Sequence, residues 1–220
     1  MSGRLILVRH GQTVANVARR LDTKLPGAEL TDLGVAQART LGQGFAQQPP
    51  TALFASQALR ARQTAEHVEL AARVTTVVRE GLHEVQVGEL EDRSDEESHA
   101  LFMKVYESWH TGDLRDRVPG GESGLDVLDR YLPVVESLRT DYLDDGSGDV
   151  VVVSHGAAIR LVAAHLGRVP GSFATSNHLA NTQSVELVPL PGGGWECVRW
   201  GTFQTPFHDT GRAGADDPMG

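Results

Sequence analysis

The sequence is poor in several features that would point to particular protein classes. It has one cysteine, Cys197, which excludes an internal disulfide and favours a reducing compartment. It has only two lysines, Lys24 and Lys104, and a formal net charge of −9, which argues against nucleic acid as a partner. No apolar run is long enough to span a bilayer, and no basic region followed by an apolar one opens the chain. We therefore expect no secretory signal, no membrane association and a cytoplasmic location.

Patterns typical of metal and nucleotide sites are missing as well. The nine histidines include no His-Glu-x-x-His motif, and one cysteine cannot build a thiolate zinc site. The glycine pair at Gly120 and Gly121 lacks the lysine and the serine or threonine of a P-loop. We expect neither a metal nor a cofactor. Any site for an anion must be built locally from a few converging cations.

What the chain does contain is a pair of short apolar runs that each lead to a histidine. Residues 5–8 are all apolar and are followed by one arginine and His10, and residues 150–153 are four valines followed by one serine and His155. Such runs are typical of strands buried on both faces of a parallel sheet. Functional groups in open α/β sheets lie outside the carboxyl ends of the strands. If both strands share one parallel sheet, His10 and His155 emerge at the same edge and can face each other.

Strand-like and helical patterns alternate along the rest of the chain. This alternation predicts one α/β domain over residues 1–209, a three-layer α-β-α sandwich with a mostly parallel central sheet and a C-terminal antiparallel hairpin. Residues 210–220 are small and polar, and we expect them to be a disordered tail. We expect helices at about 31–47, 57–72, 95–109, 124–142 and 157–166, and further strands at 51–55, 74–78, 185–190 and 195–200.

Five short motifs follow one another in the chain. They are Arg9-His10-Gly11-Gln12-Thr13 with Asn16, residues 56–65 with Arg60, Leu82-His83-Glu84-Val85 with Gly88, residues 119–123, and Ser154-His155-Gly156. Together and in this order they resemble the motifs of the histidine phosphatase superfamily, which includes cofactor-dependent phosphoglycerate mutases and many small phosphatases. The resemblance runs from Leu5 to about Trp200 and implies a phosphoglycerate mutase-like fold.

The resemblance implies that His10 is a nucleophile that forms a phosphohistidine. A neutral imidazole can attack phosphorus in line, and nearby arginines help because they disfavour its cationic form. The resemblance assigns two cations, Arg9 and Arg60, to the phosphoryl oxygens, for which the planar fork of arginine is well suited. Arg62 is the nearby alternative to Arg60, and a solvated helix arginine is the ordinary interpretation of either.

The resemblance also implies a general acid at Glu84, which would protonate the leaving alkoxide and then act as base for water. Its position after Leu82 selects it, because Glu80, Glu89 and Glu91 are equally polar neighbours. By itself an exposed loop glutamate is usually only a solubilising residue.

Three further residues are implied as phosphate contacts. His155 would donate hydrogen bonds to the transferring oxygens, and Gly156 would offer a backbone N–H at the positive end of the following helix. Asn16 is a secondary phosphate contact, with a helix N-cap as its structural alternative. Glu122 and Ser123 are expected to have structural roles.

A phosphatase and a mutase would share the phosphohistidine step and differ in the acceptor, which is water in one and a second hydroxyl in the other. The resembling mutases carry a larger, basic insertion after the acid-bearing loop, whereas residues 85–97 are short and acidic here. We therefore predict a metal-independent phosphomonoesterase acting on small phosphorylated metabolites. A phosphoglycerate mutase, and a non-enzymatic module that binds phosphorylated ligands or phosphoproteins, are the alternatives. The physiological substrate and a homodimer are left open.

One stretch departs from the pattern. The resembling family usually has a glutamine-glycine or similar small pair after the first motif, but this chain has a stiffer segment at residues 21–27. Pro26 restricts its backbone and Asp22 adds a negative charge. Recognition beyond the phosphate is therefore expected to be unusual. Lys24 could contact a second anionic group of a substrate or be a solvated loop lysine, and we favour the solvated lysine.

Overall fold

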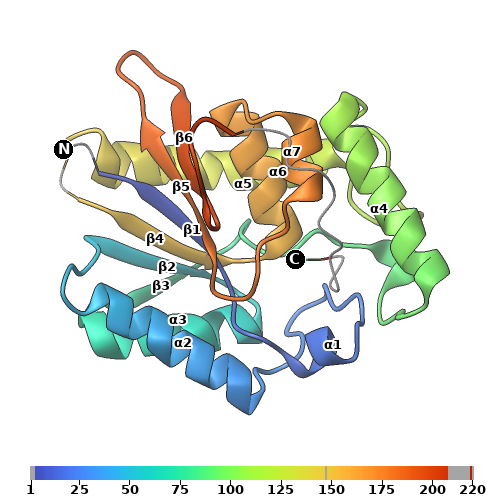
Figure 1. Cartoon of the computed structure of the whole chain (residues 1–220), viewed down its shortest axis with the longest axis horizontal. Coiled ribbons are helices and arrows are strands. Elements are labelled where there is room, and N and C mark those ends of the chain that lie inside the picture. Colours follow the sequence, from blue (N-terminus) through green and yellow to red (C-terminus); the bar gives the residue numbers. More distant parts are fainter. Residues whose placement is uncertain (1–2, 147, 208–218, 220) are drawn as a thin grey trace.

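A seven-stranded sheet of order β3-β2-β4-β1-β5-β6-β7 runs through the centre of the molecule (Figure 1). The computed structural model describes residues 3–146, 148–207 and 219. The first four strands in the chain pair in parallel, whereas β5, β6 and β7 are added antiparallel to them. The strands are β1 (Leu5–Arg9), β2 (Ala52–Ser56), β3 (Thr76–Arg79), β4 (Val150–Ser154), β5 (Ser184–Pro189), β6 (Trp195–Trp200) and β7 (Phe203–Gln204). The mostly parallel sheet and its C-terminal hairpin confirm the predicted fold class.

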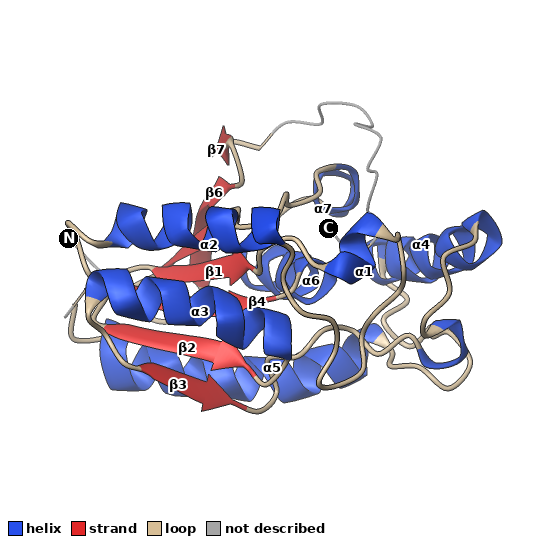
Figure 2. Ribbon diagram, turned by 90° about the horizontal axis from the view of Figure 1, so that it is seen from below, coloured by secondary structure: helices blue, strands red, loops and turns tan. Residues whose placement is uncertain are grey.

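Helices cover both faces of this sheet. Figure 2 shows α2 and α3 on one face and α5 and α6 on the other, with α4 and α7 beyond α6 and the short α1 near the carboxyl end of β1. The helices are α1 (Val14–Val17), α2 (Asp32–Phe45), α3 (Leu59–Ala72), α4 (Glu96–Thr111), α5 (Gly124–Leu138), α6 (Gly156–Gly167) and α7 (Gly171–Ser176), with a 3-10 turn at Gly88–Leu90 and a π-helical turn at Arg139–Leu143. The structure therefore has the three predicted layers.

The central strands β1 and β4 are buried along their whole length, as their apolar runs predict. Their side chains alternate between two core clusters. Ile6 and Val8 pack with the α3 side chains, whereas Leu5 and Leu7 belong to the larger cluster that includes side chains of α5 and α6. Burying both faces stabilises the fold by roughly 25 cal/mol per Å² of apolar surface. This burial fixes the register Arg9 to Ser154, and it brings the residues after both strands to one edge.

The predicted helices and strands are present, with boundary shifts of a few residues. The expected helix over 124–142 is wrong at its end: the α-helix stops at Leu138 and the chain continues as the π-helical turn. The sequence reasoning missed α1, α7, β7 and the 3-10 turn, which are all six residues or shorter. Such short elements carry too little periodicity to be recognised from a sequence.

The predicted disordered tail, 210–220, lies outside the described residues except for Met219. This methionine is 6% exposed and packs in the larger core cluster. Within residues 3–146, 148–207 and 219, no helix is long and apolar enough to cross a membrane.

Candidate active site

His10 follows the last residue of β1 and is buried, with 4% of its surface exposed. The backbone turns here close to α2, and a Cβ on Gly11 would lie 2.6 Å from the carbonyl oxygen of Gly34, so only glycine fits. The Nδ1 atom of His10 lies 2.7 Å from the Gly11 carbonyl oxygen. A carbonyl only accepts hydrogen bonds, so this contact assigns the ring proton to Nδ1. The lone pair of the neutral ring is therefore on Nε2.

The surroundings of His10 keep the ring neutral. Burial, the Arg60 charge and the Arg9 charge all lower the pKa of His10 well below its ordinary value, and the bond to Gly11 opposes them. Nε2 accepts a hydrogen bond from Nε of Arg60 at 3.1 Å. The atom that would attack phosphorus is thus unprotonated and directed at an arginine.

Two arginines flank this ring from different elements. Arg60 lies in the first turn of α3 and is 2% exposed, while Arg62, two residues on, is exposed to solvent. Arg9, the last residue of β1, is 3% exposed and donates from Nη1 to the carbonyl of Leu179 at 2.6 Å. The structure therefore brings Arg60 and not Arg62 to the histidine, in agreement with the motif spacing.

Glu84 lies in the loop after β3 and is also buried, at 2% exposure. Its Oε1 accepts hydrogen bonds from the backbone N–H groups of Val85 at 2.8 Å and Ala158 at 2.9 Å, and its Oε2 accepts from Ala157 at 3.2 Å. Burial raises the pKa of Glu84, although these hydrogen bonds and the Arg60 charge act in the opposite direction. A raised pKa favours the protonated form of this carboxyl group, which is the form that a general acid needs.

The backbone of the acid-bearing loop is held by Arg130 of α5. Its guanidinium donates to the carbonyls of Gly81 at 2.7 Å, His83 at 2.8 Å and Glu84 at 3.1 Å. The same guanidinium forms a two-point ion pair with Glu122, at 2.7 and 2.9 Å. The sequence reasoning missed Arg130, since an arginine within a helix carries no motif; the structural role expected of Glu122 agrees with this pairing.

His155 stands opposite His10 at the same sheet edge. The two rings are 5.3 Å apart between centroids at an interplanar angle of 63°. The Nε2 atom of His155 lies 2.8 Å from Oγ of Ser56, which itself accepts a hydrogen bond from Ala58 N–H. The serine hydroxyl can donate to Nε2 or accept from it, and when it donates, the proton of a neutral His155 is on Nδ1. Burial and the Arg60 charge lower the pKa of His155, which favours this neutral form.

In that tautomer, the Nδ1–H of His155 is the group that a ligand would satisfy. This nitrogen is buried and has no hydrogen-bond partner in the part of the chain that the structure describes. Buried polar groups are rarely left unpaired in native proteins. A phosphoryl oxygen between His10 and His155 would accept this hydrogen bond.

The two remaining predicted residues, Asn16 and Gly156, also have structural roles. Asn16 is the third residue of α1 and completes a capping box with Thr13, its Oδ1 accepting from Thr13 N–H at 3.0 Å. Gly156 begins α6 and is buried, but the next two N–H groups of this helix bind Glu84. The helix N-terminus thus holds the acid and leaves only its first N–H for a phosphate.

Across residues 3–146, 148–207 and 219, no three His, Cys, Asp or Glu side chains are grouped closely enough to hold a metal ion. Arg60 and Arg9 are the arginines whose charges act on His10.

Comparison with known proteins identifies the same superfamily that the motifs resemble. A family model for the histidine phosphatase superfamily (branch 1) matches residues 5–202. A glucosyl-3-phosphoglycerate phosphatase of Mycolicibacterium vanbaalenii is 32% identical over 189 residues, which cover 84% of this chain and 83% of the relative. A probable phosphoglycerate mutase of Erwinia tasmaniensis is 29% identical over 194 residues, covering 88% of each chain.

Solved structures show the same likeness. The native structure of a mycobacterial glucosyl-3-phosphoglycerate phosphatase superposes with a TM-score of 0.78 at 26% identity, covering 91% of this chain and 99% of that one. The family match spans most of the 220 residues. The chain belongs to the histidine phosphatase superfamily and is a phosphatase, a phosphoric monoester hydrolase, of that superfamily.

Proposed function

We propose that this phosphatase hydrolyses small phosphomonoesters without a metal, through a phosphohistidine at His10. The observation that carries the proposal is the proton arrangement of the buried site. His10 has its lone pair on Nε2 in contact with Nε of Arg60, while burial favours the protonated form of Glu84. One group is therefore ready to attack and the other is ready to donate a proton.

In the first step, the phosphoryl group of the substrate takes over the hydrogen bonds of Arg60, and His155 donates its Nδ1–H to a phosphoryl oxygen. Nε2 of His10 attacks phosphorus, a P–N bond forms and the bond to the ester oxygen breaks. Glu84 gives its proton to the departing alkoxide, which leaves as an alcohol. The arginines balance the charge on the phosphoryl oxygens throughout this displacement.

In the second step, the ionised Glu84 takes a proton from water as the water oxygen attacks phosphorus. The P–N bond breaks, inorganic phosphate leaves and Nε2 of His10 regains its lone pair. Glu84 is again protonated, so the cycle closes without any further acid or base.

A mutase is the weaker alternative because of the segment after the acid. Val85 and Val87 are each 1% exposed, and the 3-10 turn Gly88–Leu90 packs its backbone against Gly120 and Gly121. A mutase must retain a phosphorylated intermediate while it turns over in the pocket. The one basic residue of this short acidic segment, Arg93, is exposed and paired with Asp95, so the segment is poorly suited to that purpose.

A screen for phosphate release in EDTA tests the proposal. It covers sugar phosphates, phosphoglycerates with and without a glucosyl group, phosphoamino acids and nucleotides, with His10→Ala as the blank. Release that EDTA leaves intact and that the variant loses supports the proposal. Efficient interconversion of 3- and 2-phosphoglycerate with little free phosphate would favour the mutase instead.

A further inference from the structure

Asp22 places a carboxylate directly against the arginine of the phosphate site. Its Oδ2 lies 3.4 Å from Nη1 of Arg60, and its backbone carbonyl accepts from Nη2 at 3.1 Å. The third nitrogen of the same guanidinium, Nε, faces Nε2 of His10. One planar guanidinium therefore separates the nucleophile from this carboxylate, so Asp22 borders the place where Arg60 would hold a phosphate.

The segment that carries Asp22 is held firmly in place. Leu21 exchanges backbone hydrogen bonds with Asp92 and Arg93, both at 2.9 Å. Glu91 accepts from the backbone of Thr23 and Lys24. The Asp22 carboxylate is thus fixed toward the site and does not depend on a mobile loop.

Gly27 closes the segment over Arg60. Its φ is +73°, and a Cβ there would lie 2.3 Å from Nη1 of Arg60, so a side chain at this position would displace the guanidinium. The Pro26 carbonyl accepts from Leu59 N–H at 2.8 Å, which ties the segment to the start of α3. The close approach of chain and arginine is therefore built into the backbone.

One oxygen of Asp22 remains for a ligand. In the part of the chain that the structure describes, the hydrogen bonds of this carboxylate come from Arg60 Nη1 and Ala28 N–H, and both go to Oδ2. The side chain is 15% exposed, so Oδ1 can meet a bound molecule in a partly desolvated place. A carboxylate oxygen accepts a hydroxyl hydrogen bond and repels another carboxylate or phosphate.

We propose that Asp22 selects the leaving group: it favours phosphomonoesters of neutral, hydroxyl-bearing alcohols, such as sugars or polyols, and disfavours those with a second anionic group beside the phosphate. The inference rests on the proposed function and deepens it. Asp22 is accompanied by Glu91, whose charge also reaches Arg60. Lys24 is exposed and makes its hydrogen bond to Glu91 through its backbone, so its ammonium is screened by water.

Binding of two matched phosphonates by calorimetry tests this selection without any turnover. The probes are 3-hydroxypropylphosphonate and 3-phosphonopropionate, which differ in carrying a hydroxyl or a carboxylate at the far carbon. Wild type is expected to bind the hydroxyl compound about tenfold more tightly, the factor expected for one added like charge at a partly buried site. In Asp22→Asn, and in Asp22→Gln as a second neutral variant, this ratio should fall to about threefold or less.

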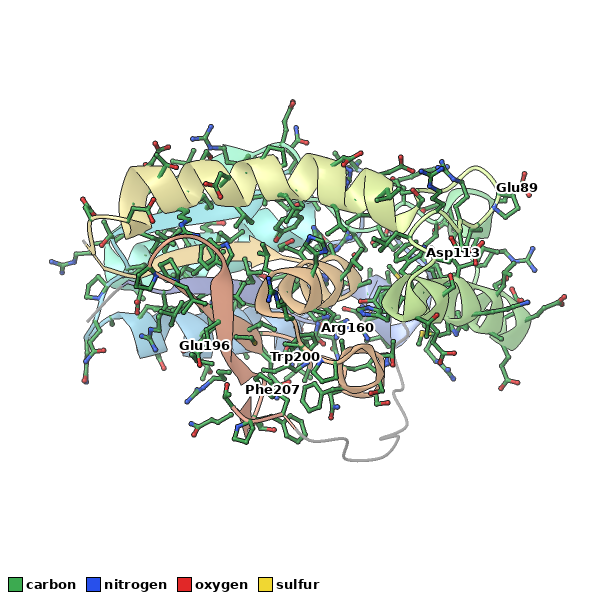
Figure 3. The ribbon with its side chains drawn as sticks, turned by 90° about the horizontal axis from the view of Figure 1, so that it is seen from above. Glu89, Asp113, Arg160, Glu196, Trp200 and Phe207 are labelled. Atoms are coloured by element: carbon green, nitrogen blue, oxygen red, sulfur yellow. The ribbon has the colours of Figure 1, made fainter. Side chains whose placement is uncertain are left out.

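Asp113→Asn is the matched control, because it removes the same charge from the exposed residue beyond the end of α4 labelled in Figure 3, and it should leave the ratio unchanged. If both Asp22 variants kept the wild-type ratio of the two affinities while both affinities changed equally, Asp22 would only position Arg60, and the inference would be overturned. A wild type that prefers the carboxylate compound would overturn it too. Failure of the proposed function is seen separately, as absence of His10-dependent phosphate release, while the binding ratio still decides the role of Asp22.

Discussion

The two halves of the site are built in different ways. In the proposed mechanism, the nucleophile half consists of Arg9, His10 and Arg60, which lie at the end of a central strand or in the first turn of a helix that follows one. The acid half is Glu84 in a loop, whose backbone depends on Arg130 and whose carboxylate depends on the N-terminus of α6. The first half is positioned by the sheet, and the second by polar contacts between distant segments. Substitutions in the acid half should therefore lower activity by graded amounts, whereas substitutions in the nucleophile half should abolish nearly all activity.

The largest effect is expected for His10→Ala in the nucleophile half. Loss of a covalent nucleophile should lower kcat by roughly 10⁴-fold or more. The measurement is phosphate release at saturating substrate, with circular dichroism to verify folding. His165→Ala, at an exposed position on α6, is the matched control and should retain full activity. Substantial turnover in His10→Ala would contradict the assignment.

Glu84→Gln should have the next largest effect, and its size should depend on the leaving group. An alkyl phosphate should react about 10²–10⁴-fold more slowly, since its alkoxide needs a proton. The loss should be much smaller for release of p-nitrophenolate from p-nitrophenyl phosphate, measured in the first turnover. Glu89→Gln removes an exposed carboxylate, labelled in Figure 3, and serves as the control. An equal loss for both leaving groups would argue against an acid role.

Arg130→Met tests whether the acid half depends on distant contacts. Displacing the loop by about 1 Å should cost up to about 10²-fold in kcat, again mostly for alkyl phosphates. Glu122→Gln and the double variant complete a cycle, and their effects should be far from additive because the pair acts as one unit. If Arg130→Met lost activity equally for aryl and alkyl phosphates, the arginine would be a general stabiliser and not a positioning residue for Glu84.

The pH profile compares the two halves in one experiment. On the acid side, the rate should fall when Nε2 of His10 is protonated, and the lowered pKa of His10 moves this limb to lower pH. On the alkaline side, the rate should fall when Glu84 loses its proton, and the raised pKa of Glu84 moves this limb to higher pH. Each limb of kcat/KM should change about tenfold per pH unit. In Glu84→Gln the alkaline limb should disappear while the acid limb stays. If Glu84→Gln lost the acid limb instead, the assignment of the acid limb to His10 and of the alkaline limb to Glu84 would be contradicted.

The sequence predicted one half of the site better than the other for a physical reason. Buried strands and the residues that follow them leave an apolar run and a motif, so His10, Arg9 and His155 can be found from the sequence alone. Glu84 is selected only by its place in a resembling motif, because its burial arises from the loop packing against α6. Arg130, Ser56 and the inward direction of Asp22 depend on contacts between segments far apart in the chain, which a sequence pattern does not contain. The π-helical turn after Leu138 also has distant contacts, since Arg139 donates to the carbonyls of Leu190 and Gly194.

Trapping the phosphorylated enzyme tests the covalent mechanism itself. Glu84→Gln protein is mixed with p-nitrophenyl phosphate, whose leaving group needs no acid, and is quenched in alkali before peptide mapping. Without its base the second step is slow, so the phosphoryl group should accumulate on His10 as an alkali-stable, acid-labile adduct. The double variant with His10→Ala should carry none. No adduct, or an adduct on another residue, would contradict the conclusion that His10 carries the phosphoryl group.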